Sequence, residues 1–548
     1  MSREGEISHT APVVDGLCRS YLDLKYHYDP ASASAAGLVA QDSRLGSFDL
    51  ESTREHVVAL RSLAGAAEEL EPEEVQEEID RTALLGEIRT TIYRLEYELP
   101  NVRNPGLWLS HLFQALYTLV TRNEPELAGR APAVKARLDA TPAFLEAARE
   151  TIEAPPTVFM DTAFSMLGGG GQLIAQVVSV FAGAAPDLAG DLQASGEGAL
   201  RALVAFGAAL RDEIEPSGDP QAFAIGEEQF SRRLHFEHAL NAGPSELWRY
   251  GQALQEEVTG EIVALARRLD SRPWREVVDQ LRSDTPASHD LLGAYRRELD
   301  RAQAFVSDHD LVAMPEAPVE VVSTPAFLAA LVPFAAYEPP PIYLSGRAGR
   351  FYVTQPDPSL PAAAYQQQLR GHCVHAIPAM VAHEAYPGHH LQLVRSQGLG
   401  SEVRRHIWSP IMVEGWALYS EQLMRESEYY RTEQERMFQL VNLLWRAVRV
   451  VLDVGLHVRG MTPAAAVDYM VEHLPIERAS AEAEVRRYCA WPTYQLCYAV
   501  GRRELLRLRQ ARRARDGHRF HPRRFHDEVM QYGGLPVSLA SWGMGVGE

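Results

Sequence analysis

One segment rich in histidine and glutamate constrains this chain more than any other. It contains His383 and Glu384, then the pair His389 and His390, and further on Glu414. A catalytic zinc ion takes three protein ligands of nitrogen or oxygen type and leaves one position for water. The ion lowers the pKa of that water, and a neighbouring carboxylate accepts its proton. The order of the residues predicts that Glu384, next to the first imidazole, is this base.

The spacing of these histidines differs from that of the usual zinc motif, H-E-x-x-H, in which the two histidines lie one helical turn apart. Here the position one turn after His383 is Pro387, which offers no metal ligand. On a straight helix His389 would face away from His383, and His390 would lie about 10 Å further along the axis. Pro387 and Gly388 therefore predict a break or bulge in the helix that brings a later histidine to the metal.

These motifs resemble those of a large, mostly bacterial family of uncharacterised proteins with HEAYPGHHLQ and EGWALYAE-type segments. That family is similar in fold to the carboxypeptidase Taq family of gluzincin-type zinc carboxypeptidases, whose motif reads H-E-x-G-H. Aligning the glycine–histidine pairs places His389 on the second ligand and leaves His390 beside the site, while Glu414 matches the third ligand. The resemblance thus implies one zinc ion per chain, held by His383, His389 and Glu414.

The resemblance also implies a mainly α, zincin-like fold with a deep cleft and a small β hairpin or sheet beside the zinc helix. Helical periodicity agrees with this, and we expect a helical scaffold lobe over 1–310 and a catalytic lobe over 311–548, as one continuous two-lobed unit. Two β-prone runs, 339–344 and 350–353, predict the hairpin. The glycine run 168–171 lacks the residues that complete a phosphate-binding loop, and it predicts a flexible break between helices.

Two more residues are expected to act at the metal. Glu421 lies two helical turns after Glu414 and is predicted to orient a metal-binding histidine. The segment after residue 490 resembles the family's P-G-Q-A-x-x-Y-x-x-G motif, which makes Tyr498 the candidate for stabilising an oxyanion. The chain departs from that motif at Thr493 and Tyr494, where the family has glycine and glutamine.

Two arginines are candidates for binding a carboxylate of the substrate. Arg502 lies one helical turn after Tyr498, and Arg350 follows the turn of the predicted hairpin. A guanidinium group binds a carboxylate with two parallel hydrogen bonds, which suits an enzyme that removes residues from a peptide end.

Composition narrows the partners and the location. A net charge of −20 argues against a nucleic acid or an anionic membrane as partner. No uninterrupted apolar run is long enough for a membrane span, and the N-terminus lacks the pattern of a signal peptide. The four cysteines show no paired spacing, which favours a reducing cytoplasm. A peptide or small molecule is the expected substrate, and a homodimer is compatible with the sequence.

The sequence therefore predicts a zinc metallohydrolase, by resemblance a carboxypeptidase. Two alternatives stay open. The same site could act on a non-peptide amide or ester, or the chain could be a catalytically silent helical binding protein. The presence of Glu384 argues against the silent alternative, because a purely structural zinc site needs closed coordination and no base.

Overall fold

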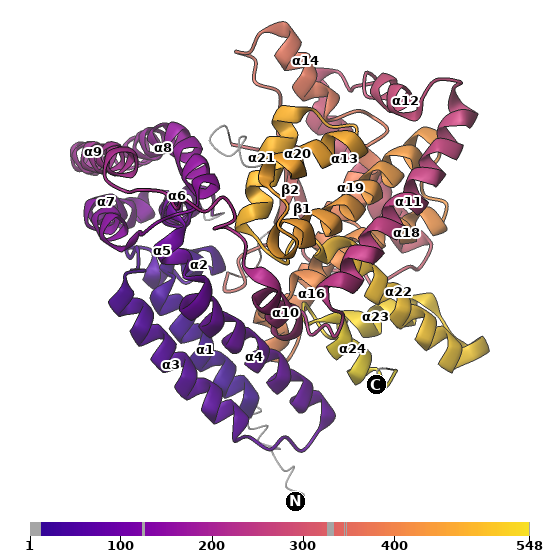
Figure 1. Cartoon of the computed structure of the whole chain (residues 1–548), viewed down its shortest axis with the longest axis horizontal. Coiled ribbons are helices and arrows are strands. Elements are labelled where there is room, and N and C mark those ends of the chain that lie inside the picture. Colours follow the sequence, from indigo (N-terminus) through magenta and orange to yellow (C-terminus); the bar gives the residue numbers. More distant parts are fainter. Residues whose placement is uncertain (1–12, 123–126, 326–333, 345, 347, 547–548) are drawn as a thin grey trace, which may run out of the picture.

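The computed structural model describes residues 13–122, 127–325, 334–344, 346 and 348–546. The described chain is mainly helical, as predicted, and carries one small sheet (Figure 1). The helices of the N-terminal part are α1 (Val13–Tyr28), α2 (Pro30–Ala36), α3 (Leu50–Glu68), α4 (Val75–Tyr93), α5 (Pro100–Arg103), α6 (Pro105–Thr121), α7 (Ala131–Thr151), α8 (Thr157–Ala184) and α9 (Ala189–Asp212).

The remaining elements of the described chain are the three strands of the sheet and fifteen further α-helices. They are α10 (Gly226–Phe236), α11 (Pro244–Leu269), α12 (Trp274–Leu281), α13 (Leu291–Asp308), β1 (Val319–Ser323), β2 (Ala335–Glu338), β3 (Gly349–Val353), α14 (Ala362–Arg370), α15 (Ile377–Glu384), α16 (His389–Gln397), α17 (Glu402–His406), α18 (Pro410–Glu426), α19 (Glu433–Val458), α20 (Pro463–His473), α21 (Arg478–Ala490), α22 (Cys497–Asp516), α23 (Pro522–Met530) and α24 (Val537–Gly543).

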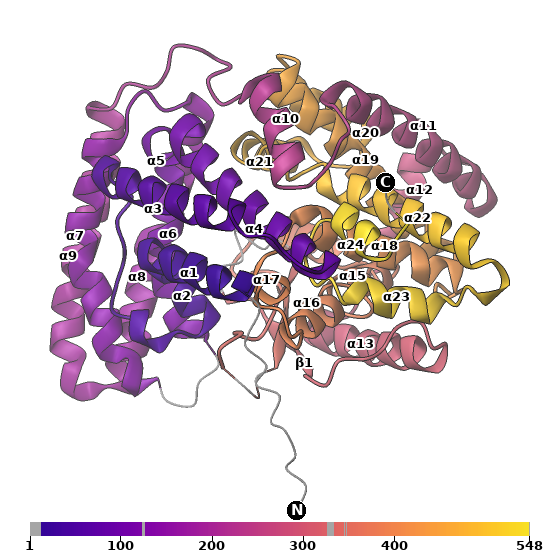
Figure 2. The ribbon, with the colours of Figure 1, turned by 90° about the horizontal axis from the view of Figure 1, so that it is seen from below.

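Two groups of helices lie side by side and are joined by a common core. In the two views α1–α9 lie mostly on one side and the other elements on the other (Figures 1 and 2), while α1, α3 and α4 share a core with α13, α15, α18 and α22–α24. The predicted boundary at residue 310 stays a prediction; α10, α11 and α12, which precede it, share a second core with α18–α22. The apolar face of α11, with Leu247, Leu254 and Ile262, is buried there. A helix joins the group that covers its apolar stripe, whatever its place in the sequence.

The sheet contains the predicted hairpin, but its first strand lies elsewhere. The strand order is β1-β3-β2, with β1 parallel and β2 antiparallel to β3. The second strand of the hairpin is β3, as expected, whereas the first is β2 rather than 339–344. Three consecutive prolines at 339–341 explain the error, because proline has no N–H group to donate to a strand ladder. In the strand order β1-β3-β2, β2 forms one edge of the sheet.

Helices α18 and α22 touch through their backbones. A Cβ atom placed on Gly415 would lie 2.6 Å from the backbone of Gly501, and one on Gly501 would lie 2.0 Å from the carbonyl oxygen of Ile411. Neither position can hold a larger residue unless the helices separate. The contact sets the distance between two helices that both carry predicted site residues.

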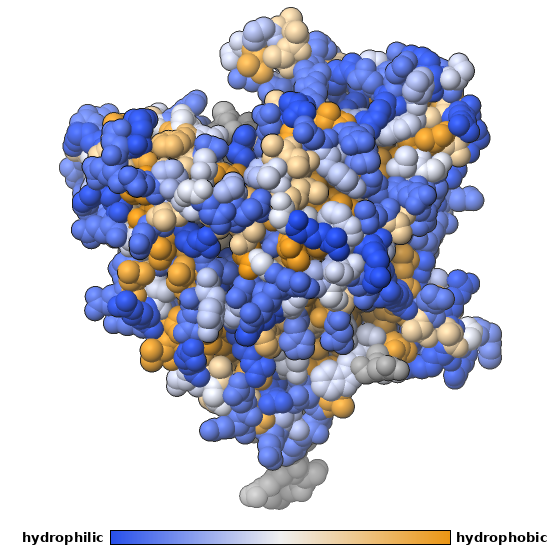
Figure 3. All heavy atoms as spheres, in the orientation of Figure 1, coloured by the Kyte–Doolittle hydropathy of each residue, from blue (hydrophilic) through white to orange (hydrophobic). Residues whose placement is uncertain are grey.

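Helix α8 contains the glycine run 168–171, so the predicted break between helices is wrong. Among the described helices, α8 is long and apolar enough to cross a membrane by length and composition, with 28% of its most apolar window buried. Its buried residues, including Leu173, Ile174 and Phe181, belong to a core shared with α6, α7 and α9. The face shown in Figure 3 is largely hydrophilic, with its apolar side chains in small scattered groups.

We expect Gly501→Ala to lower the free energy of unfolding by about 1–3 kcal/mol, because the added methyl group meets rigid backbone atoms. The midpoint of urea unfolding, followed by circular dichroism, measures this change. Gly260→Ala in α11 is the matched control, since a Cβ atom there meets nothing within 4 Å. That variant should be as stable as the wild type or up to about 1 kcal/mol more stable. Equal stability of Gly501→Ala and the wild type would contradict the close packing of α18 on α22.

Candidate metal centre

The helix that contains the first histidine ends where the sequence predicts a break. Helix α15 stops at Glu384 and α16 starts at His389. Gly388 makes this short connection feasible, because a Cβ atom at that position would lie 1.8 Å from the carbonyl oxygen of His383. The indole N–H of Trp416, on α18, donates to the carbonyl of Pro387 at 2.8 Å and fixes the connection from the other side. The predicted break in the helix is confirmed.

The break brings His383 and His389 together with Glu414, which lies on α18. One ligand atom from each residue lies within 4.8 Å of the others. The Oε2 atom of Glu414 is 3.4 Å from Nε2 of His389 and 3.8 Å from Nε2 of His383. The three side chains are between 5% and 9% exposed. Two imidazoles and one carboxylate facing a common centre form a donor set that suits zinc.

The electrostatics of this cluster favour a cation at its centre. Burial alone would lower the pKa of His383, but Glu414 and Glu421 raise it to about 9. Burial would also oppose ionisation of Glu414, yet its bonds with His383 and His389 hold the pKa of its carboxyl well below the usual value. The surroundings therefore supply more negative charge than two neutral imidazoles can balance. A divalent ion would fit this donor set and supply the missing positive charge.

Glu421 takes the orienting position predicted for it. Its Oε1 atom lies 2.9 Å from Nδ1 of His383, which leaves Nε2 of that ring for the metal. Glu421 is itself fully buried, and its Oε2 atom accepts a hydrogen bond from Asn442 of α19 at 3.4 Å. The ring of His383 is therefore held in place through two helices.

His390 has different partners from His389, although the two are adjacent. The Nδ1 atom of His390 lies 2.9 Å from the hydroxyl of Tyr337, and its Nε2 atom lies 3.1 Å from the carbonyl oxygen of Ala317. Both ring nitrogens are thus occupied by protein groups. By contrast, Nε2 of His389 faces Glu414, and its buried Nδ1 has no hydrogen-bond partner in the described residues. Of the two histidines, His389 therefore belongs to the cluster that could hold a metal ion, and His390 lies next to it.

Glu384, the predicted base, lies beside the free edge of the sheet. Its Oε2 atom accepts a hydrogen bond from the backbone N–H of Tyr337 in β2 at 3.1 Å. Tyr337 is paired with Phe351 of β3, but its N–H points away from β3 because it reaches Glu384. Glu384 and the outer edge of β2 therefore adjoin each other.

The segment before α22 brings a second tyrosine to the metal centre, and the sequence analysis missed its role. The hydroxyl of Tyr494 donates to Oε1 of Glu414 at 2.5 Å. The preceding residue, Thr493, has a φ of +65°, a conformation that suits glycine, which the resemblance led us to expect there. Asp453 of α19 holds the segment by accepting bonds from the N–H groups of Thr493 and Leu496, both at 3.0 Å. The sequence signal for this role was Tyr494 itself, which stands where the family motif has glutamine.

Tyr498, the predicted oxyanion-stabilising residue, lies close to the first histidine. The centres of the rings of Tyr498 and His383 are 6.3 Å apart, with 20° between the ring planes. No hydrogen bond of the Tyr498 hydroxyl is found among the described residues. This hydroxyl could therefore bond to an added group without losing a partner in the described chain.

The two arginines predicted to bind substrate have partners elsewhere. Arg502 donates through Nε to the side chain of Gln422 on α18 at 2.6 Å and contacts none of the metal-site residues in the described chain. Arg350 donates to the carbonyl of Thr121, at the end of α6. Strand β3 alternates its faces, so Arg350 and Phe351 point to opposite sides of the sheet, and only Phe351 packs into the core. These two predictions are not supported.

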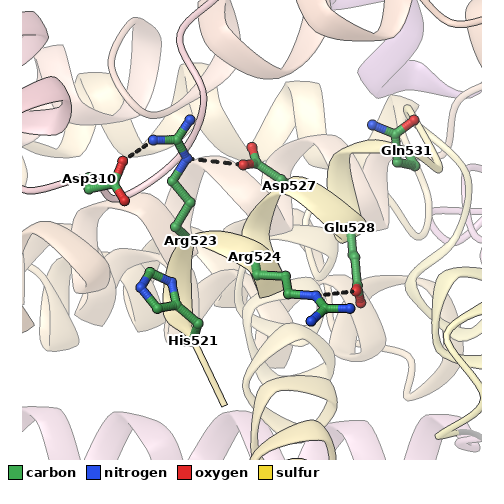
Figure 4. A pocket seen from close by; sticks show the side chains of 7 residues that line it. All are labelled: Asp310, His521, Arg523, Arg524, Asp527, Glu528 and Gln531. Carbon is green, nitrogen blue, oxygen red and sulfur yellow. Dashed lines mark hydrogen bonds and ion pairs between the residues drawn. The ribbon is translucent and has the colours of Figure 1, made fainter. Parts of the chain in front are cut away.

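Two surface cavities of the described chain lie away from the metal-centre residues. One, of about 400 Å³, lies along α23, where Arg523 sits between Asp310 and Asp527 and Arg524 pairs with Glu528 (Figure 4). Its charged groups are therefore paired with each other. The other, of about 270 Å³, lies between α4, α10 and α24. The deep cleft expected over the metal centre stays a prediction.

Comparisons with known proteins agree with the motifs on which the site is built. The model of the family described as "Bacterial protein of unknown function (DUF885)" matches residues 30–541. The chain belongs to this family. None of the curated proteins matches the sequence. The function of the family therefore has to be argued from the arrangement of its residues.

Two solved structures share the fold of this family member. One is described as a "putative lipoprotein of unknown function" from Shewanella oneidensis, with 21% identity and a TM-score of 0.79, covering 97% of this chain and 100% of the other. The second, described as a "putative lipoprotein" from Colwellia psychrerythraea, has 18% identity and a TM-score of 0.83, covering 97% and 98%. Similarity at this level of identity establishes the shared fold.

The two adjacent histidines can be separated by a pair of matched variants. We expect His389→Ala to lose bound zinc, because it removes one of three ligands, and His390→Ala to keep about one ion per chain. Zinc content after dialysis, measured by mass spectrometry of the metal, tests this. The assignment would be wrong if His390→Ala lost the ion and His389→Ala retained it.

Substitution of the two tyrosines, Tyr494 and Tyr498, should affect zinc affinity to different extents. Tyr494→Phe removes a hydrogen bond to a metal ligand, and we expect zinc affinity to fall on the order of 10- to 100-fold. Tyr498→Phe removes a hydroxyl that contacts no ligand and should leave zinc affinity nearly unchanged. Competition with a zinc-binding dye measures both affinities. Equal effects of the two substitutions would contradict the distinct roles of the two hydroxyls.

Proposed function

We propose that this protein is a zinc-dependent metallohydrolase, and most simply a peptidase of the carboxypeptidase type with a zincin-like arrangement. The observation that carries the proposal is the convergence of His383, His389 and Glu414, together with the carboxylate of Glu384, which follows His383 and is bonded to the edge strand β2. Three ligands with an open position and an adjacent base are the requirements of zinc hydrolysis. A structural zinc site needs neither the base nor the strand edge.

In this proposal each residue has a defined task. Zinc, when bound, supplies a water of lowered pKa and polarises the bond to be cleaved. Glu384 accepts the proton of that water and delivers it to the leaving amine. The Tyr498 hydroxyl donates a hydrogen bond to the oxyanion that develops on the former carbonyl oxygen. Glu421 keeps His383 in the tautomer that presents Nε2 to the metal.

The free edge of β2 favours a peptide over other amides or esters. An extended peptide adds to such an edge through main-chain hydrogen bonds, and the outward N–H of Tyr337 already lies at the base. A peptide aligned there would carry its backbone past Glu384. A non-peptide amide or ester remains the alternative substrate, because the same metal chemistry would cleave it.

The proposed location is a reducing compartment, as the sequence suggested. The cysteines Cys18, Cys373, Cys489 and Cys497 are buried and free. Burial raises the pKa of the Cys373 thiol to about 12, which suppresses the reactive thiolate. These side chains pack in the cores like small apolar residues.

We expect Glu384→Gln to keep zinc but to lose turnover by on the order of 10²- to 10⁴-fold, because the amide cannot accept a proton. Digestion of a mixed peptide pool by the zinc-loaded protein, followed by mass spectrometry, provides the assay. The exposed Glu482→Gln, on α21, is the matched control and should behave like the wild type. Full activity of Glu384→Gln against a substrate cleaved by the wild type would exclude this mechanism.

A further inference from the structure

A group of arginines lies beside the proposed metal centre, around the ring of Tyr498. The guanidinium carbons of Arg449 and Arg446, both on α19, lie 4.9 and 5.6 Å from the centre of that ring. Arg487 of α21 is close enough to act on the same phenol electrostatically. Since the ring of Tyr498 is 6.3 Å from that of His383, this positive charge adjoins the first metal ligand.

One carboxylate is shared by two of these arginines. Glu484 lies 3.1 Å from Arg449 and 2.7 Å from Arg487. Arg449 also donates through Nε to the hydroxyl of Tyr488 at 2.8 Å, and that hydroxyl donates to Glu484 at 2.6 Å. This network satisfies much of the hydrogen bonding of Arg449. It still leaves the group with more positive than negative charge.

Arg446 has the fewest partners of the three. It forms no ion pair with a described residue, and its one hydrogen bond there is to the carbonyl oxygen of Asn442, at 3.4 Å. Its Nε atom is buried and has no partner among the described residues. A guanidinium has five N–H donors, and a part-buried one left this free is costly unless an anion completes it. A carboxylate does so with two parallel hydrogen bonds.

We propose that Arg446 is the anchor of a subsite for a carboxylate group of the substrate, next to Tyr498. This inference deepens the proposed function and rests on it, since it adds a recognition element to the same site. It also replaces Arg502 and Arg350, which are bonded elsewhere. Any ligand bound there meets the free hydroxyl of Tyr498 and lies toward His383.

The position of Arg446 on α19 ties the subsite to the metal centre. Arg446 comes one helical turn after Asn442, and Asn442 bonds to Glu421, which holds His383. One face of α19 therefore carries Arg446 and, through Asn442 and Glu421, also holds the ring of His383. This fixed separation would select substrates whose carboxylate lies at one distance from the bond that is cleaved.

Three small probes distinguish the source of the carboxylate. N-acetylphenylalanine carries a terminal carboxylate, N-acetylphenylalaninamide carries none, and N-acetylglutamic acid α-amide carries one on its side chain. Binding is measured by isothermal titration calorimetry on the full chain, both zinc-loaded and after zinc removal. We expect the first probe to bind on the order of 10- to 100-fold more tightly than the amide, as for a charge-assisted hydrogen bond. Tighter binding of the third probe would assign the subsite to acidic side chains.

The variants test whether this preference depends on one side chain. Arg446→Gln should abolish the preference for the carboxylate, and Arg446→Lys should retain part of it, because the charge remains without the planar fork. Arg436→Gln is the matched control, since Arg436 lies on the same helix, is exposed and has no side-chain partner in the described chain. Circular dichroism of each variant checks that it folds.

The outcomes separate this inference from the proposed function. Equal binding of all three probes by the wild type, or an unchanged preference in Arg446→Gln, would overturn the subsite. Loss of the preference in Arg436→Gln as well would also overturn it. A wild type that discriminates between the probes but cleaves no peptide would support the subsite and refute the peptidase. Cleavage of peptides whether or not they carry a free carboxylate would support the peptidase and refute the subsite.

Discussion

The backbone contact between Gly415 and Gly501 is the constraint on which the metal centre depends. Helix α18 carries the ligand Glu414 and the orienting residue Glu421, and α22 carries Tyr498. With side chains of ordinary size between them, helices pack with their axes 8–10 Å apart. Two glycines facing each other remove that spacer, so the helix that carries Glu414 lies directly against the helix that carries Tyr498. A site of this size tolerates little misplacement, because catalytic groups must be held to within about 0.5 Å.

Helix α19 also holds residues of the site in place. Asn442, Arg446, Arg449 and Asp453 recur at intervals of three or four residues, so they share one face of this helix. Asn442 holds Glu421, the two arginines flank Tyr498, and Asp453 holds the segment that carries Tyr494. None of these residues belongs to the cluster of His383, His389 and Glu414. They determine where that cluster and its neighbours can lie, as supporting groups do in metal sites generally.

The sequence pointed to the cluster of His383, His389 and Glu414 because candidate metal ligands are recognised by residue type and by a local feature. Pro387 and Gly388 predict a break, and the helix does end there, with His389 rather than His390 facing Glu414. The predicted substrate contacts of Arg502 and Arg350 have no support in the structure, because nearness in sequence to a site residue does not fix the direction of a side chain. Arg350 is bonded to the carbonyl of Thr121, and Arg502 is bonded to Gln422. The proposed role of Arg446 rests on how few protein groups bond to its guanidinium. No sequence pattern shows which partners a side chain has in the fold.

The charge balance of the site links metal binding to stability. The carboxylates of Glu414 and Glu421 are almost completely removed from water, and each would be costly to bury without a compensating positive charge. In the metal-free chain, protonated His383 provides that charge, which agrees with its pKa of about 9. On the proposed function, a divalent ion would provide this charge more completely and free the imidazole to act as a ligand. Its binding would then stabilise the fold by a free energy that rises with the logarithm of the ion concentration over its dissociation constant. The same buried acids would favour a cation over a neutral group at this position.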